Sequence, residues 1–327
     1  MTSVSPQVVA GSSAPARKLD SAAATGWRAW LELTKPKIVL LMLVTCVSGM
    51  VLAEQGLPDL LTLAATLLGL AFSIGGASAL NHVFDAGLDR RMARTATRPV
   101  ASGTIGPWMA AGFGVLLFTL GGTFLCLYVS NLVAWTALFG GAFYVAVYTP
   151  LKRVTVHNTV LGGVAGAVPP LVGWAAVTGD LASPLAWTLF AIMFMWQPAH
   201  FWPLSLLIRE DYARAGFRML PVTHGERATV NATWRWMWLT VAATIVPLAT
   251  RDAGLIYAVG ALGANVYLIR RTWRLVAADR ARGEHPSVPL VGAGADPAGR
   301  LAARNAFLGS LVWLAVIFVA LLVDALI

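Results

Sequence analysis

Long apolar segments separated by short polar ones recur along the whole chain. Most of them are about as long as a helix that crosses a bilayer, which needs roughly 17 to 25 residues. Backbone polar groups must be satisfied within such a segment, so we expect α-helices. The pattern predicts an all-α, polytopic membrane protein with about nine transmembrane helices, at residues 38–53, 60–80, 108–128, 131–149, 158–178, 185–207, 236–250, 253–269 and 305–326.

The composition supports this class of protein. Of the 327 residues, 57% are hydrophobic and 12% charged, and the mean hydropathy is +0.70. A soluble domain is usually about one quarter charged. Glycine and proline inside the apolar segments, at Gly75-Gly76, Pro169-Pro170, Pro198 and Pro203, are expected to bend or break helices that neighbouring segments then support.

Positive charge is concentrated on one side of the predicted topology. The formal net charge is +9, and nine spans with an inside N-terminus place every one of the 24 lysines and arginines except Arg251 on the same face. The positive-inside rule makes that face cytoplasmic in a bacterial inner membrane, or the matrix side in a mitochondrial inner membrane. No basic and aromatic module stands apart from the loops, so nucleic-acid binding is not expected.

The N-terminal segment has a different composition from the rest of the chain. Its first 26 residues are rich in Ala, Ser and Pro and contain no apolar region typical of a signal peptide. We therefore predict a disordered cytoplasmic tail over residues 1–30 and a single membrane domain over residues 31–327.

A dense polar cluster follows the second predicted span. Asn81, Asp85 and Asp89 are spaced four residues apart, so on a helix they share one face. Two carboxylates at this spacing repel each other, more strongly in a low dielectric, unless a cation lies between them. The stripe is therefore interpreted as a cation site, and the alternative is a solvated helix cap without chemistry.

The chemistry of these side chains indicates the ligand. Hard oxygen donors suit Mg²⁺, which is often shared between carboxylates and substrate phosphates, while the nearby Arg94 and Arg98 suit phosphate oxygens. A second acidic and basic patch, with Asp211 and Arg214, follows the sixth span on the same face. A diphosphate held beside apolar helices indicates a prenyl diphosphate substrate, and Tyr144, Tyr148 and Tyr212 are candidates to stabilise a carbocation.

Several motifs resemble those of a known family. The stretch from Asn81 to Pro99 resembles the first acidic motif of the UbiA-type intramembrane prenyltransferases, whose fold is nine transmembrane helices around a central cavity. Five further motifs resemble those of the branch of this family that farnesylates protoheme IX. They are Thr34-Lys35-Pro36-Lys37, Tyr148-Thr149-Pro150-Leu151-Lys152-Arg153, Asn158 with 166–174, Trp196-Gln197 with His200-Phe201, and Asp211-Tyr212 with 215–221.

This resemblance implies an activity and a set of roles. It implies transfer of farnesyl from farnesyl diphosphate to the carbon-2 vinyl group of heme B, with addition of water, for the cofactor of heme–copper oxidases. The metal ligands and catalytic residues would be Asn81, Asp85, Asp89 and Asp211, and the substrate-binding residues Arg94, Arg98, Lys152, Arg153, Arg214, Tyr148, Tyr212 and His200. The second motif departs from the family because it lacks a clean Asp-x3-Asp, so its metal ligand stays open.

Other interpretations remain open from the sequence. The acceptor could be an aromatic acid or a chlorophyll-type ring, although Tyr148-Thr149-Pro150 and the Trp196-Gln197 element argue against both. Intramembrane charges also mark transporters, but here the charges lie at one membrane face. A noncatalytic assembly protein would not need the acidic stripe, and a docking partner that modifies heme further is an additional expectation.

Overall fold

The computed structural model describes residues 25–283, 288–292, 294–295 and 297–327, and this part of the chain consists of helices and their connections. The predicted tail largely lies outside the described residues. Helix α1 (Trp27–Leu33) is an exception, because residues 27–30 belong to it and not to a tail. Its Ala29 and Leu33 are buried in one apolar cluster, against which Trp30 packs, and the Trp30 ring meets Phe113 at 5.1 Å.

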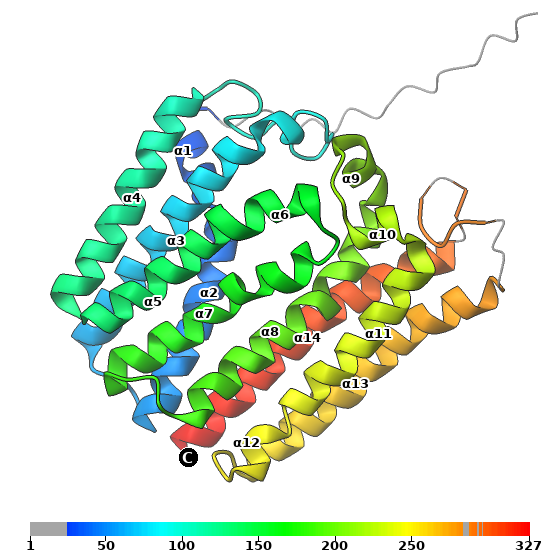
Figure 1. Ribbon diagram of the computed structural model, residues 1–327. Coiled ribbons are helices and arrows are strands. Elements are labelled where there is room, and N and C mark those ends of the chain that lie inside the picture. The colour runs from blue at the N-terminus through cyan, green and yellow to red at the C-terminus, as the bar shows by residue number, and fades with distance from the viewer. Residues whose placement is uncertain (1–24, 284–287, 293, 296) are drawn as a thin grey trace, which may run out of the picture.

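Long helices run side by side and their ends form two faces of the molecule (Figure 1). The first half contains α2 (Pro36–Glu54), α3 (Leu60–Asp89), α4 (Pro107–Tyr128), then α5 (Asn131–Ala142), the π-helix η1 (Phe143–Tyr148) and α6 (Thr149–Val154), which follow one another without a break. The second half contains α7 (Asn158–Thr178), α8 (Pro184–Leu207), α11 (Gly225–Ala243), α13 (Leu255–Ala281) and α14 (Pro297–Leu326).

Short helices mark the two faces. α9 (Arg209–Ala215) and α10 (Leu220–Thr223) lie at the same end of the molecule as α1, whereas α12 (Val246–Ala249) lies with the C-terminus at the other end (Figure 1). Six helical segments in the described residues are long and apolar enough to cross a membrane: α2, α3, α4, α5 through α6, α7 and α14. The protein is thus a multi-pass, all-helical membrane protein, and the total of nine spans stays a prediction.

Small residues allow the helices of the first half to approach closely. A Cβ atom on Gly76 would meet the backbone of Phe118 in α4, and one on Gly49 would meet the Pro170 carbonyl in α7. Such contacts are the usual way in which helices pack in lipid. The break expected at Gly75-Gly76 does not occur, and α3 continues to Asp89, because these glycines serve packing.

The prolines do not break their helices either. α7 is continuous through Pro169-Pro170, and α8 through Pro198 and Pro203. Side chains supply hydrogen bonds to the backbone in this stretch, since Gln197 donates to the Met193 carbonyl at 3.2 Å and Thr240 donates to that of Met195 at 2.9 Å.

Candidate active site

The C-terminal turns of α3 carry a buried polar ladder. Asn81, Asp85 and Asp89 are 1%, 3% and 1% exposed, and Asn81 Nδ2 donates to Asp85 Oδ2 at 2.9 Å. The helix continues far enough for all three residues to lie on it, as the four-residue spacing predicted. The ladder therefore presents an amide and two carboxylates along one stripe near one face of the molecule.

Each carboxylate of the ladder meets a cation from another element. Arg98, in the connection between α3 and α4, donates from Nη1 to both oxygens of Asp89 at 2.9 Å. Lys152 forms an ion pair with Asp85, and Arg153 Nη2 lies 4.0 Å from Asp85 Oδ1. The span predicted for this segment ended at residue 149, but Lys152 and Arg153 lie on α6, because the helix that begins with α5 continues to Val154.

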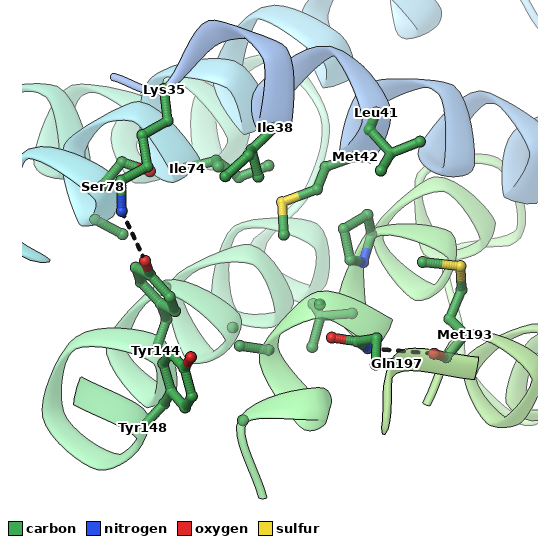
Figure 2. A pocket seen from close by; sticks show the side chains of 18 of the residues that line it. Lys35, Ile38, Leu41, Met42, Ile74, Ser78, Tyr144, Tyr148, Met193 and Gln197 are labelled. Atoms are coloured by element: carbon green, nitrogen blue, oxygen red, sulfur yellow. Dashed lines mark hydrogen bonds between the residues drawn. The ribbon is translucent and has the colours of Figure 1, made fainter. Parts of the chain in front are cut away.

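The amide of the ladder meets Lys35, a residue absent from our candidate site. Lys35 Nζ donates to Asn81 Oδ1 at 2.7 Å. It also donates to the Tyr144 hydroxyl at 3.0 Å, as Figure 2 shows. Asn81 Nδ2 also donates to Thr149 Oγ1 at 3.0 Å, so α6 supports the ladder a second time. Burial lowers the pKa of Lys35 to about 7, and the charge of Arg98 acts in the same direction.

An apolar cavity of about 340 Å³ begins beside Lys35. Ile38 and Met42 of α2 line it on one side, as Figure 2 shows, and Tyr144 and Tyr148 lie at its polar end. The two tyrosine rings are stacked with centroids 5.5 Å apart. The cavity is thus apolar, and at this end it adjoins a polar site that could hold the head group of a substrate.

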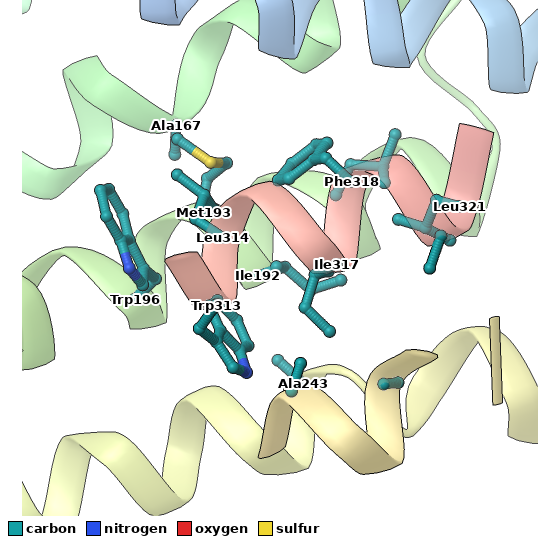
Figure 3. Close-up of a cluster of buried hydrophobic side chains, with 14 of the residues drawn as sticks. Ala167, Ile192, Met193, Trp196, Ala243, Trp313, Leu314, Ile317, Phe318 and Leu321 are labelled. Carbon is teal, nitrogen blue, oxygen red and sulfur yellow. The ribbon is translucent and has the colours of Figure 1, made fainter. Parts of the chain in front are cut away.

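His200 lines the same cavity from α8. Its ring is stacked between Trp196, at 4.4 Å, and Phe307, at 4.7 Å, and its Nδ1 lies 2.7 Å from Ser310 Oγ. Behind it, Trp313 and Ile317 of α14 pack with side chains of α8 and α13 in one apolar cluster (Figure 3). His200 is therefore held in one orientation at the edge of the cavity.

The second acidic patch is built differently. Asp211 forms an ion pair with Arg214 of the same short helix, α9, and the Arg214 side chain is 55% exposed. Tyr212 is buried and packs its ring edge-on against Phe217, with centroids 5.7 Å apart. Burial raises the pKa of Tyr212 to about 12, against the opposing charges of Arg94 and Arg98. Tyr212 also shares an apolar cluster with Met92, so α9 lies close to the segment that follows the ladder.

The predicted metal ligands are only partly brought together. In the part of the chain that the structure describes, no three His, Cys, Asp or Glu side chains gather closely enough to hold a metal ion. Asp211 therefore does not join Asp85 and Asp89. The ladder itself fits a hard cation, because its donors are oxygens and Asp85 Oδ1 is buried without a hydrogen-bond partner among the described residues.

Two residues at the site, Lys35 and Thr149, were not among our candidates from the sequence. Lys35 and Thr149 lie in motifs on which the resemblance rested, and this was the available signal. Their contacts join α2, α3 and α6, and no local spacing predicts contacts between distant helices.

Comparisons with known proteins agree with this architecture. Residues 42–287 match the model of the UbiA prenyltransferase family. A relative from Marinobacter nauticus, called protoheme IX farnesyltransferase, is 41% identical over 95% of this chain and 96% of its own length. A Nostoc relative with the same description is 40% identical over 91% and 89% of the two chains.

Solved structures share the fold at low sequence identity. A digeranylgeranylglyceryl phosphate synthase superposes with a TM-score of 0.71 and 17% identity, covering 91% of this chain and 98% of the other. A UbiA homologue from Archaeoglobus fulgidus, bound to GPP and Mg²⁺, gives a TM-score of 0.60 at 17% identity, with 90% and 99% covered. With the family model matching residues 42–287 and curated relatives 40–41% identical over at least 91% of its length, the chain belongs to the UbiA prenyltransferase family.

Proposed function

We propose that this protein transfers a farnesyl group from farnesyl diphosphate to heme B. The observation that carries the proposal is the buried ladder of Asn81, Asp85 and Asp89, which Lys35 connects to an apolar cavity. A polar site next to an apolar cavity matches the two parts of a prenyl diphosphate, which are its charged diphosphate and its apolar chain. The curated relatives, whose printed names specify farnesyl transfer to protoheme IX, support the choice of substrates.

The polar end would hold the diphosphate. Asn81, Asp85 and Asp89 would hold a divalent ion such as Mg²⁺, which would stabilise the charge on the leaving diphosphate. Arg98 and Lys152, now paired with Asp89 and Asp85, would turn to the phosphate oxygens. A solved structure with the same fold binds GPP and Mg²⁺, which supports a prenyl diphosphate and a divalent ion as ligands.

The apolar cavity would hold the farnesyl chain and keep water from it. The C1–O bond breaks and both electrons leave with the diphosphate, so positive charge develops on the allylic carbons. The faces of Tyr144 and Tyr148 lie at this end of the cavity and would stabilise that charge. Apolar walls such as Ile38 and Met42 exclude water until the acceptor attacks.

The acceptor would approach the cavity from the side of His200. The terminal carbon of the carbon-2 vinyl group forms the new C–C bond, and water then adds to the resulting cation and loses a proton, which leaves a hydroxyl group. His200, fixed by Ser310 and by two aromatic rings, would orient the porphyrin through the iron or a propionate. The product, heme O, would serve heme–copper oxidases.

Position in the cell follows from the same proposal. The ladder and its cations would face the cytoplasm of a bacterial inner membrane, where the loops rich in arginine are retained. The bacterial origin of the relatives supports this location.

The test is the mass of the product. Purified protein in detergent, given heme B, farnesyl diphosphate and Mg²⁺, is expected to yield a heme heavier by a farnesyl and a hydroxyl group. Geranyl diphosphate and geranylgeranyl diphosphate serve as length controls. An unchanged heme under conditions in which the protein binds farnesyl diphosphate would refute the proposed acceptor.

A further inference from the structure

The apolar cavity has to treat water in two opposite ways during the proposed reaction. The allylic cation at the polar end must be kept dry, whereas the cation formed on the heme must meet one water molecule. Water occupies an apolar cavity only where polar groups give it hydrogen-bond partners. A polar atom on the acceptor side of the cavity, without a partner in the protein, would therefore mark the place of that water.

Gln197 of α8 lines the cavity and offers such an atom. Its Nε2 donates to the carbonyl of Gly163 at 2.7 Å and to that of Met193 at 3.2 Å. Carbonyl oxygens only accept, so these two bonds fix which end of the amide carries the hydrogens. Figure 2 shows the nitrogen turned to Met193 and the oxygen turned away from it. Within the described residues, Gln197 Oε1 accepts no hydrogen bond, and the side chain is only partly buried.

The neighbours of Gln197 on α8 turn their polar atoms elsewhere. Trp196 Nε1 donates to the Ser310 carbonyl at 2.9 Å, and His200 Nδ1 lies 2.7 Å from Ser310 Oγ. Both contacts lead to α14 and away from the cavity. Gln197 precedes His200 by three residues, or about 4.5 Å along the helix, and both residues line the cavity. The oxygen of Gln197 therefore lies on the side from which the acceptor would approach.

Helix α7 leaves room for the Gln197 amide. Gly166 lines the same cavity, and a Cβ atom at this position would collide with Oε1 of Gln197. An alanine at residue 166 would therefore push the amide out of its present position while leaving the glutamine in the chain. The position of the oxygen thus depends on contacts from α7 as well as on α8.

We propose that Gln197 is a positioning residue for the water molecule that hydrates the alkylated heme. This inference rests on the proposed function and adds a residue for its last step. Formation of the C–C bond leaves a cation on the vinyl carbon next to the porphyrin ring. The water oxygen gives an electron pair to that carbon and forms the C–O bond, while Gln197 Oε1 accepts a hydrogen bond from one O–H group. The other hydrogen leaves as a proton, which the released diphosphate takes up.

The identity of the product tests this role. Without a positioned water, the cation loses a proton from the adjacent carbon and gives an alkenyl heme that is lighter by one water. Purified Gln197→Leu receives heme B, farnesyl diphosphate and Mg²⁺ in detergent, and mass spectrometry measures both products. The ratio of alkenyl to hydroxylated heme is expected to rise at least about tenfold, which corresponds to the loss of one buried hydrogen bond. An unchanged ratio would overturn the proposal.

A second variant tests the same contact from α7. Gly166→Ala is expected to raise the ratio as well, because the added Cβ displaces the amide oxygen. If Gln197→Leu does not fold, Gly166→Ala decides the test, and an unchanged ratio there would overturn the proposal. The wild type in water labelled with heavy oxygen should give a labelled hydroxyl group. A hydroxyl oxygen from any other source would equally refute the role.

Two controls separate this role from a structural one. Ser78→Ala removes a hydroxyl group from the polar end of the same cavity, beside Lys35 in Figure 2. Thr240→Val removes a side-chain hydrogen bond to the α8 backbone at Met195. Both should leave the ratio unchanged, and an equal rise in Thr240→Val would contradict the role of Gln197. Absence of any farnesylated heme in the wild type would refute the proposed function, whereas farnesylated heme with an unchanged ratio refutes this inference alone.

Discussion

The two acidic patches of this protein contain similar residues and differ in construction. On α3 the carboxylates of Asp85 and Asp89 are almost fully buried, and their cations come from a distant helix and a loop. On α9 the Asp211 carboxylate pairs with Arg214 one turn away, and the Arg214 side chain is 55% exposed. The first patch is a preorganised site to which several elements contribute, whereas the second is an ion pair within one short helix.

The difference lies in how much of the fold each patch holds together. The ladder joins α2 through Lys35, α6 through Lys152 and Thr149, and the loop after α3 through Arg98. The α9 ion pair joins two residues of one short helix, and α9 is fixed by the packing of Tyr212 against Phe217. The chemistry should therefore depend far more on the first patch than on the second.

The largest contrast is expected in turnover. Asp85→Ala should reduce heme farnesylation by at least about 10³-fold, since it removes a metal ligand and leaves Lys152 with no partner in the ladder. Asp211→Ala should reduce it about tenfold. Product formation is followed by mass spectrometry, with Asp252→Ala, at the opposite face, as the control. Equal losses in the Asp85 and Asp211 variants would show that both patches bind the metal.

A second contrast concerns stability. Arg98→Met leaves Asp89 buried without its cation, which costs about 3–5 kcal/mol for a buried pair. Arg214→Met removes an exposed pair, for which about 0.5 kcal/mol is typical. Thermal unfolding in detergent measures both. The double variant Arg98→Met with Asp89→Asn should recover part of the loss, and no recovery would mean that Arg98 acts through other contacts.

The ladder could be predicted from the sequence because it depends only on the spacing of residues within one helix. A spacing of four residues places side chains on one helix face whatever the rest of the fold does, so Asn81, Asp85 and Asp89 could be grouped in advance. The spacing could not show that α3 continues past the apolar run, or that each carboxylate meets its own cation. Those facts depend on the contacts that α6 and the loop carrying Arg98 make with α3, and these are tertiary contacts.

Other predictions failed for the same reason. Glycine and proline usually interrupt helices, but Gly76 here lies against the backbone of α4 and allows close packing, so α3 is unbroken. Lys35 escaped notice because its left-handed conformation before Pro36 is one that local preference disfavours. Local rules thus failed where neighbouring helices override them, and one of those places is the candidate site.

A smaller effect is expected in the dependence on Mg²⁺. Asp89→Asn should raise the Mg²⁺ concentration for half-maximal activity about tenfold, because a carboxylate oxygen binds Mg²⁺ better than an amide does. Asp211→Asn should change it less than threefold. Titration of Mg²⁺ after treatment with EDTA gives both values. If the Mg²⁺ concentration for half-maximal activity also rises tenfold in the Asp211 variant, the second patch contributes to the metal site. The contrast between the two acidic patches would then not hold.

The smallest effect is expected from alkaline pH at α9. Burial raises the pKa of Tyr212 to about 12, above its ordinary value near 10, so the folded protein keeps this proton more tightly than the unfolded chain does. Folding stability must then fall as pH rises from about 10 toward 12, because the unfolded state loses the proton first. Tyr212→Phe removes the titrating group but keeps the ring packed against Phe217, so its melting temperature should fall less steeply over this range. If the melting temperatures of the wild type and of Tyr212→Phe fall in parallel as pH rises, the Tyr212 hydroxyl is not buried in the folded state. In that case α9 is held less firmly than its contacts indicate.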